Sequence, residues 1–202
     1  MSRVPAPLAS AVTLLGLSLA LSGCGLVNST FVDSDRAQGA ENLAFRVDSR
    51  GRLVRTEYRI ATSDVPEKVC AAMDRLHPGD DYTGAEFEIR GRKTYYQLSR
   101  VVDGFRVESL FSDDGTLKEE TLQIPAEKAP IAVRETVQER FPDAVAPPGF
   151  ESLRDGQGQV KEYQVTLRLG DRTYRLSLTP EGQLARVWRE LAAEVEVPVP
   201  LP

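Results

Sequence analysis

The chain has 202 residues, of which 41% are hydrophobic and 27% are charged, and its formal net charge is −5. This composition is typical of a globular protein with one domain or two small ones. The acidic balance and the lack of a Lys/Arg-rich run argue against a nucleic-acid-binding protein.

The first 23 residues have the pattern of a secretory signal peptide. Arg3 is the one charge of the leading segment, a Leu-rich apolar run covers residues 8–21, and small residues follow at Ser22 and Gly23. These are the three parts of an export signal. The run is shorter than the roughly 18–20 apolar residues that span a bilayer as a helix, so a transmembrane anchor is the weaker interpretation.

The tetrapeptide Leu21-Ser22-Gly23-Cys24 resembles the lipobox of bacterial lipoproteins. The resemblance implies that the Cys24 thiol receives a diacylglyceryl group, that the signal is cut before Cys24, and that the new amino group is acylated. Two or three acyl chains anchor a protein to the lipid bilayer durably, whereas one chain binds only marginally. Position 25 is Gly rather than Asp, which for a Gram-negative host implies the periplasmic face of the outer membrane. In a host with one membrane, the outer cell surface is implied. The alternative is an ordinary signal peptide that ends near a cysteine.

Cys70 is the second of the two cysteines. If Cys24 carries lipid, Cys70 has no disulfide partner, although an extracytoplasmic compartment would permit a disulfide. Its place within a predicted helix favours a small buried hydrophobic side chain. A reactive thiol would need a base, and the only histidine, His77, lies about two helical turns further along.

The next segments are a tether, a hairpin and a helix. Residues 24–43 are polar and without sustained period, which predicts a flexible tether; Phe31 and Val32 are the side chains through which it could order against the folded part. Alternating apolar residues predict a β-hairpin over residues 44–60. A helix then follows from Pro66 to the stop at His77-Pro78-Gly79, because apolar residues recur at helical spacing at Val69, Ala72, Met73 and Leu76.

An antiparallel meander is predicted after this helix, because Asp-Gly pairs between strand patterns are strong hairpin signals. The same order then recurs, with a helix that opens at Pro130 and buries Val133 and Val137, followed by four more strands. The predicted strands are Ala85–Arg90, Thr94–Val102, Phe105–Phe111, Thr116–Ile124, Phe150–Arg154, Val160–Leu169, Arg172–Thr179 and Gln183–Leu191. The Pro-rich tail at 193–202 is expected to be extended.

Matching residues recur at nearly fixed spacing, which indicates an internal repeat. The offset is 64 for turn glycines, helix-start prolines and inward apolar residues (115 − 51 = 64, 130 − 66 = 64) and 67 for the following strands (163 − 96 = 67, 182 − 115 = 67). The predicted fold class is therefore α+β, with two tandem repeats of a helix packed on a four-stranded antiparallel sheet. The hairpin and first repeat would occupy residues 44–124, and the second repeat residues 125–192.

The residues that carry a family resemblance are Val65-Pro66, Pro78-Gly79, Tyr96-Gln97-Leu98 and Asp114-Gly115-Thr116-Leu117. They make the region from about Ala44 to Leu191 similar to the PepSY-like group, which includes tandem modules resembling the β-lactamase-inhibitor protein. The resemblance implies the same repeated helix-on-sheet unit, and a role in binding or inhibiting proteins or in accompanying peptidases. The repeats lack the inhibitor's disulfide pairs, which leaves the partner open.

Candidate catalytic and metal residues are few. One histidine and one unpaired cysteine do not make an ordinary zinc site, and His77 matches Phe141, so it is expected at a helix-end packing position. Turn chemistry accounts for Asp80-Asp81 and Asp113-Asp114. We therefore predict no catalytic residue, metal or cofactor. A hydrolase that uses an unrecognised carboxylate, with Glu108, Glu119 and Glu120 as candidates, is the least favoured alternative.

Two aromatic residues are predicted to bind a partner. Tyr95 is adjacent to the inward Tyr96 and therefore faces the other side of its strand, and Trp188 lies in the last strand. Exposed aromatic side chains are frequent at protein interfaces; the alternative for Trp188 is packing under the second helix. The sequence predicts a non-catalytic, lipid-anchored, extracytoplasmic module that binds an envelope protein or peptide. A structural lipoprotein subunit of a membrane assembly is the main alternative.

Overall fold

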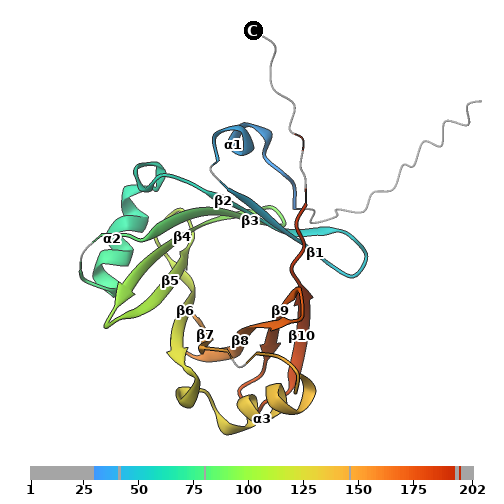
Figure 1. Ribbon diagram of the computed structural model, residues 1–202. Coiled ribbons are helices and arrows are strands. Elements are labelled where there is room, and N and C mark those ends of the chain that lie inside the picture. The colour runs from blue at the N-terminus through green and yellow to red at the C-terminus, as the bar shows by residue number, and fades with distance from the viewer. Residues whose placement is uncertain (1–29, 41, 80, 146, 194–195, 197–202) are drawn as a thin grey trace, which may run out of the picture.

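The computed structural model describes residues 30–40, 42–79, 81–145, 147–193 and 196. Its ten strands form one antiparallel sheet, in which each strand pairs with the next along the chain. The sheet curls round until β10 approaches β1, and the helices lie on its outside (Figure 1). The strands are β1 (Leu43–Val47), β2 (Leu53–Arg59), β3 (Gly84–Arg90), β4 (Lys93–Val102), β5 (Phe105–Phe111), β6 (Leu117–Pro125), β7 (Gly149–Asp155), β8 (Val160–Leu169), β9 (Arg172–Leu178) and β10 (Leu184–Arg189).

The continuous sheet shows that the predicted fold class is wrong. The sequence predicted two units, each with its own four-stranded sheet, but β6 pairs with β7 from Glu119↔Asp155 to Pro125↔Gly149. The hairpin is joined in the same way, since β2 pairs with β3. Separate sheets would have left rows of unpaired N–H and C=O groups along these edges, and edge-to-edge pairing satisfies them.

The individual elements agree closely with prediction, although their assembly does not. β5 and β8 have the predicted bounds, and the two predicted helices are α2 (Glu67–Leu76) and α3 (Ile131–Arg140). Pro66 and Pro130 stand immediately before them as N-caps. Proline suits the start of a helix because its missing N–H has no intrahelical partner there.

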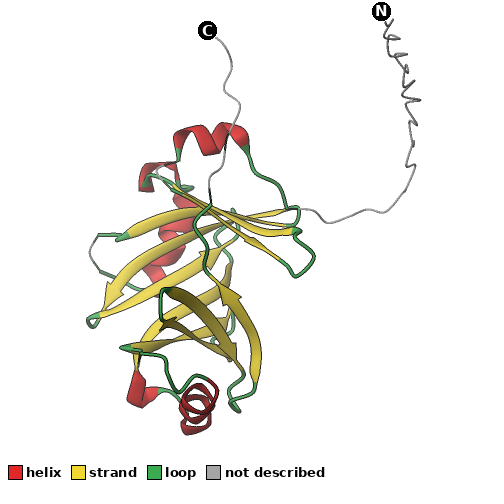
Figure 2. Cartoon of the chain, turned by 45° about the vertical axis from the view of Figure 1, so that its right-hand side comes forward, coloured by secondary structure: helices red, strands yellow, loops and turns green. Residues whose placement is uncertain are grey.

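Apolar side chains on the outer face of the sheet form the core under the helices. α2 buries Val69 and Met73 against Leu98 and Phe111. α3 covers the other half of the sheet in the same manner, as Figure 2 shows; its Val133 belongs to a cluster with Val165, Leu167, Leu176 and Leu178. Full burial of each such side chain contributes roughly 1.5–3 kcal/mol, so this packing is the main source of stability.

A turn glycine packs against the first turn of each of these helices. Gly115 and Gly182 have φ values of +83° and +85°, a region that other residues rarely adopt. A Cβ atom on Gly115 would lie 2.7 Å from the carbonyl oxygen of Lys68, and one on Gly182 would lie 2.5 Å from that of Ala132. Lys68 and Ala132 are the second residues of α2 and α3, so the two halves of the sheet contact their helices in an equivalent way.

The described part of the predicted tether contacts the sheet. The Asp33 backbone N–H donates to the Tyr58 hydroxyl at 2.6 Å, and the Thr56 hydroxyl donates to the Phe31 carbonyl at 3.1 Å. The short helix α1 (Ser34–Gly39) lies between these contacts and β1, and its N-cap is Asp33. The sequence predicted ordering through the side chains of Phe31 and Val32, but the contact uses the backbone of Phe31, whose side chain is exposed.

The predicted signal peptide at 1–23, Cys24, and all of the tail at 193–202 except residues 193 and 196 lie outside the described residues. Within the described ranges, every helix is too short or too polar to cross a lipid bilayer.

Candidate functional site

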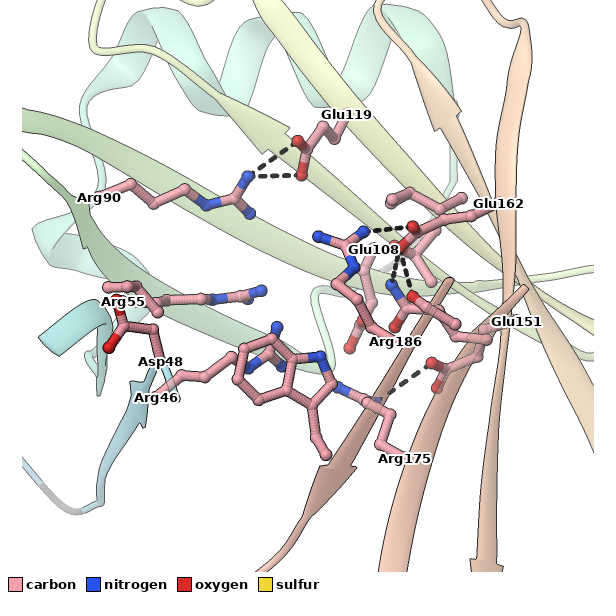
Figure 3. A pocket seen from close by; sticks show the side chains of 16 residues that line it. Arg46, Asp48, Arg55, Arg90, Glu108, Glu119, Glu151, Glu162, Arg175 and Arg186 are labelled. Carbon is pink, nitrogen blue, oxygen red and sulfur yellow. Dashed lines mark hydrogen bonds and ion pairs between the residues drawn. The ribbon is translucent and has the colours of Figure 1, made fainter. Parts of the chain in front are cut away.

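Polar and apolar side chains alternate along the strands of the curled sheet, and the polar side chains point to its inner face. Successive side chains of a strand point to opposite faces, so residues between the outward apolar positions point inward. They line a cavity of about 440 Å³, which we call the inner cavity (Figure 3). Register shifts between Arg46 and Val47, Leu110 and Phe111, and Leu153 and Arg154 interrupt the strand pairing. Such bulges bend a sheet and help it to curl round the cavity.

Charged residues of both signs dominate the lining of the inner cavity. They come from both ends of the sheet, so segments far apart in the chain share this site (Figure 3). The arginines are Arg46, Arg55, Arg90, Arg175 and Arg186, and the acidic residues are Asp48, Glu108, Glu119, Glu151 and Glu162. The two signs balance in number, so the cavity as a whole carries no large excess of either charge.

All but one of these arginines are bonded to carboxylates. Arg90 Nη1 donates to both carboxylate oxygens of Glu119 at 2.8 Å. Arg175 lies 3.1 Å from a Glu151 oxygen, and Arg186 is paired with Glu162. Arg55 is bonded to Glu57 and lies 3.0 Å from Glu88.

Arg46 differs from the other four arginines. It makes no hydrogen bond or ion pair with any residue in the described part of the chain. Its guanidinium carbon lies 4.8 Å from the ring centre of Trp188. This contact joins β1 to β10 across the seam where the two edge strands approach without pairing. Burial is the main cause that lowers the pKa of Arg46 to about 10; the neighbouring charge of Arg55 also lowers it, whereas the charges of Glu57 and Glu88 raise it.

Two partly buried carboxyl groups lie on the inner face, Glu86 on β3 and Glu108 on β5. Burial is the main cause of the raised pKa values of Glu86 and Glu108, and the charge of Glu57 adds to both shifts. Glu86 accepts a hydrogen bond from Gln97 Nε2 at 3.2 Å, and Glu108 is paired with Arg106 at 2.5 Å. The inner face therefore holds acidic groups that are costly to ionise as well as an arginine without a counterion.

Both aromatic residues predicted to bind a partner lie on this inner face. Trp188 lines the inner cavity and stands opposite Arg175 in the strand register. It therefore does not pack under α3, which lies on the outer face. Tyr95 stands opposite Glu88, and its ring centre lies 5.8 Å from the guanidinium carbon of Arg90, but it is outside the cavity lining. Partner binding by these two residues stays a prediction.

The other residues considered from the sequence occupy separate places. His77 caps the end of α2 as Phe141 caps α3, and its Nε2 lies 2.6 Å from a Glu120 oxygen. This pair lies on the outer face, whereas Glu108 and Glu119 line the inner cavity.

Cys70 and Asp114, which the sequence analysis also considered, lie apart from both the His77–Glu120 pair and the inner cavity. Cys70 is half-buried beside the core under α2, and burial raises the pKa of its thiol. Asp114 accepts hydrogen bonds from the Ser112 hydroxyl and the Thr116 N–H in its turn. Asp80 lies outside the described residues, and among those described no three His, Cys, Asp or Glu side chains are grouped to hold a metal ion.

Sequence reasoning missed Arg46 and the inner cavity itself. The available signal was a charged residue at every second position of a strand, such as Arg55 and Glu57 in β2 or Glu86 and Glu88 in β3. Residues at this spacing share one face of the sheet. The same pattern is typical of a flat sheet with one solvated face. The curvature that turns this face into a cavity depends on bulges and strand pairing, which the pattern of charges does not contain.

Comparisons with known proteins find similarity at the level of the fold. No protein-family model matches the sequence, and no curated protein matches it either. A solved structure of a Bacteroides eggerthii protein proposed to be periplasmic has a TM-score of 0.51 and 19% identity, over 62% of this chain and 88% of that chain. A DUF2874 family protein from Bacteroides uniformis has a TM-score of 0.49 and 16% identity, over 61% and 88% of the two chains. A BLIP-like protein from Bacteroides fragilis has a TM-score of 0.48 and 20% identity, over 64% and 89%. The chain thus shares the fold of the first of these structures over most of that structure's length.

Proposed function

We propose that this chain is a non-catalytic binding protein that receives a segment of a protein or peptide partner in the inner cavity. The observation that carries the proposal is the enclosure of a balanced set of charged side chains, with Arg46 left without a counterion at the seam. The volume of about 440 Å³ falls in the usual range for ligand sites, roughly 300–1,000 Å³, but such sites are mostly apolar. A charged lining suits a polar segment of a partner better than an apolar small molecule.

The proposal places the protein outside the cytoplasm, attached to a membrane by lipid on Cys24. The lipobox-like Leu21-Ser22-Gly23-Cys24 supports this location, and so does the periplasmic assignment proposed for the Bacteroides eggerthii protein. The resemblance to the PepSY-like group and its β-lactamase-inhibitor-like modules makes inhibition of the captured partner one form of this function. Cys24→Ser should abolish incorporation of labelled palmitate and move the protein from the membrane fraction to the soluble fraction. Normal labelling and retention of that variant would contradict the anchor.

Photo-crosslinking in the native cells tests whether the inner cavity is the binding surface. A photoreactive residue at Thr121 faces the inner cavity, whereas one at Gln138 lies on the exposed side of α3. In the full-length protein we expect a discrete crosslinked species from Thr121 and none from Gln138. Equal crosslinking from both positions, or none from Thr121, would overturn the proposal.

A carboxylate hydrolase is the second candidate, and one observation favours it. Partial burial raises the pKa of Glu108 and the negative charge of Glu151 adds to this shift, whereas Arg106, with which Glu108 is paired, lowers it. Two carboxyl groups in different surroundings are the usual composition of an acid–base pair. Glu108→Gln separates the two functions. A binding protein would still crosslink through Thr121, whereas a hydrolase would convert its captured substrate only with Glu108 intact.

A further inference from the structure

We propose that Arg46 and Trp188 form a docking site for a single carboxylate, carried by an acidic side chain of the partner segment. This inference rests on the proposed function, because it names the chemical group that the inner cavity receives. It also assigns the β1–β10 seam as the place where that group binds.

The first argument is that Arg46 has no ion-pair partner among the described residues. Arg46 and Arg55 stand directly opposite each other in the register of β1 and β2, and like charges in that position destabilise a sheet. Arg55 is compensated, since it is bonded to Glu57 and Glu88. Arg46 has no carboxylate partner among the described residues, so an incoming carboxylate would relieve the repulsion.

The second argument is the way Trp188 holds Arg46. The guanidinium group lies over the indole ring, with its carbon 4.8 Å from the ring centre. A guanidinium group over an indole ring is itself stabilising. The Arg46 side chain makes no hydrogen bond with any described residue, so its N–H donors remain available for a paired, two-point contact with a carboxylate. Trp188 thus holds Arg46 at the seam and leaves these donors available.

The third argument concerns the charge of the ligand. Five arginines and five acidic residues line the inner cavity, so a group with two negative charges would meet repulsion beyond the seam. One unpaired arginine matches one negative charge. The Nε atom of Arg55, which is buried and has no partner in the described residues, is a further donor on the strand next to Arg46. A carboxylate therefore fits better than a phosphate group.

The fluorescence of Trp188 supplies the experiment, because it is the only tryptophan of the chain. Random octapeptides are selected for binding to the full-length protein in detergent, and each selected peptide is remade with Gln in place of its Glu or Asp. Binding is followed by Trp188 fluorescence. The protein variants are Arg46→Gln, Arg46→Lys and, as a matched control, Arg140→Gln on the exposed side of α3. Sodium acetate is titrated as the free carboxylate.

We expect the selected peptides to be rich in acidic residues, and removal of the key carboxylate to weaken binding about tenfold or more. Arg46→Gln should weaken binding of the acidic peptide by a similar factor and leave binding of the Gln-containing peptide unchanged. Arg46→Lys should be intermediate, because lysine lacks the planar fork, and Arg140→Gln should have no effect. Acetate should compete only at far higher concentration than the peptide.

Several results would overturn the inference. Peptides that crosslink through Thr121 but bind equally with Glu or Gln would remove the carboxylate site and leave the proposed function standing. Acetate that binds as tightly as the peptide would make the seam a site for small anions. If no peptide binds or crosslinks in the inner cavity, both the proposed function and this inference fail.

Discussion

Arg175 and Leu176 are neighbours on β9, yet they face opposite sides of the sheet. Leu176 is fully buried in the core under α3, whereas Arg175 lines the inner cavity and is paired with Glu151. The outer face is stabilised by apolar packing, and the inner face is organised by ion pairs around one unpaired arginine. The main apolar packing thus lies on one face and the proposed binding site on the other, so inner-face substitutions should change binding while leaving most of the stability intact.

The largest expected difference is between these two neighbours. Leu176→Ala should lower the free energy of unfolding by about 2–5 kcal/mol, because it leaves a cavity in the core. Arg175→Ala should lower it by less than about 1 kcal/mol, because the side chain is 40% exposed and its ion pair is partly solvated. Urea denaturation measures both values. Similar losses of unfolding free energy in the two variants would show that the inner face contributes as much to stability as the outer face.

A smaller effect tests how closely the helices must approach the outer face. Gly158 and Gly182 have φ values of +80° and +85°, but only Gly182 faces a backbone carbonyl, that of Ala132. Gly158→Ala should cost about 1–2 kcal/mol from the backbone conformation alone. Gly182→Ala should cost more, because its Cβ would also collide with the first turn of α3. Equal losses of stability, measured by denaturation of the two variants, would show that α3 shifts to make room for the new Cβ atom at position 182.

The smallest effect concerns the pH dependence of the inner face. Burial raises the pKa of Glu86 above its ordinary value of 4.5, so the folded state binds this proton more tightly than the unfolded state does. The resulting stability is fully present below pH 4.5 and is lost as the pH rises through the folded-state pKa. Glu86→Gln should therefore be more stable than the natural protein at pH 7, by an amount that shrinks toward pH 4.5. Glu139→Gln, on the exposed side of α3, is the control and should show no such change.

Local patterns in the sequence predict the elements well and their assembly poorly. The spacing of Val133 and Val137 gives the buried face of α3, and the alternation in residues 160–169 gives β8 with the right bounds. The pairing of β6 with β7 could not be predicted in this way, because each strand pattern leaves both of its edges available. The same limit applies to the site. The placement of Tyr95 on the face opposite to Tyr96 follows from alternation, but the meeting of Arg46 with Trp188 depends on the curvature of the entire sheet.

The consecutive pairing of all ten strands also has a mechanical consequence. Neighbouring strands are rotated by about 20–25° relative to each other, so small changes at successive interfaces add along the sheet and are largest at the β1–β10 seam. The distance between Arg46 and Trp188 is therefore set by every strand pair between them. A change in the core packing under α2 or α3 would therefore widen or narrow the seam, although no residue at the seam itself is changed. The outer face, which lies away from the proposed site, would in this way set the width of the seam at which we propose that a ligand binds.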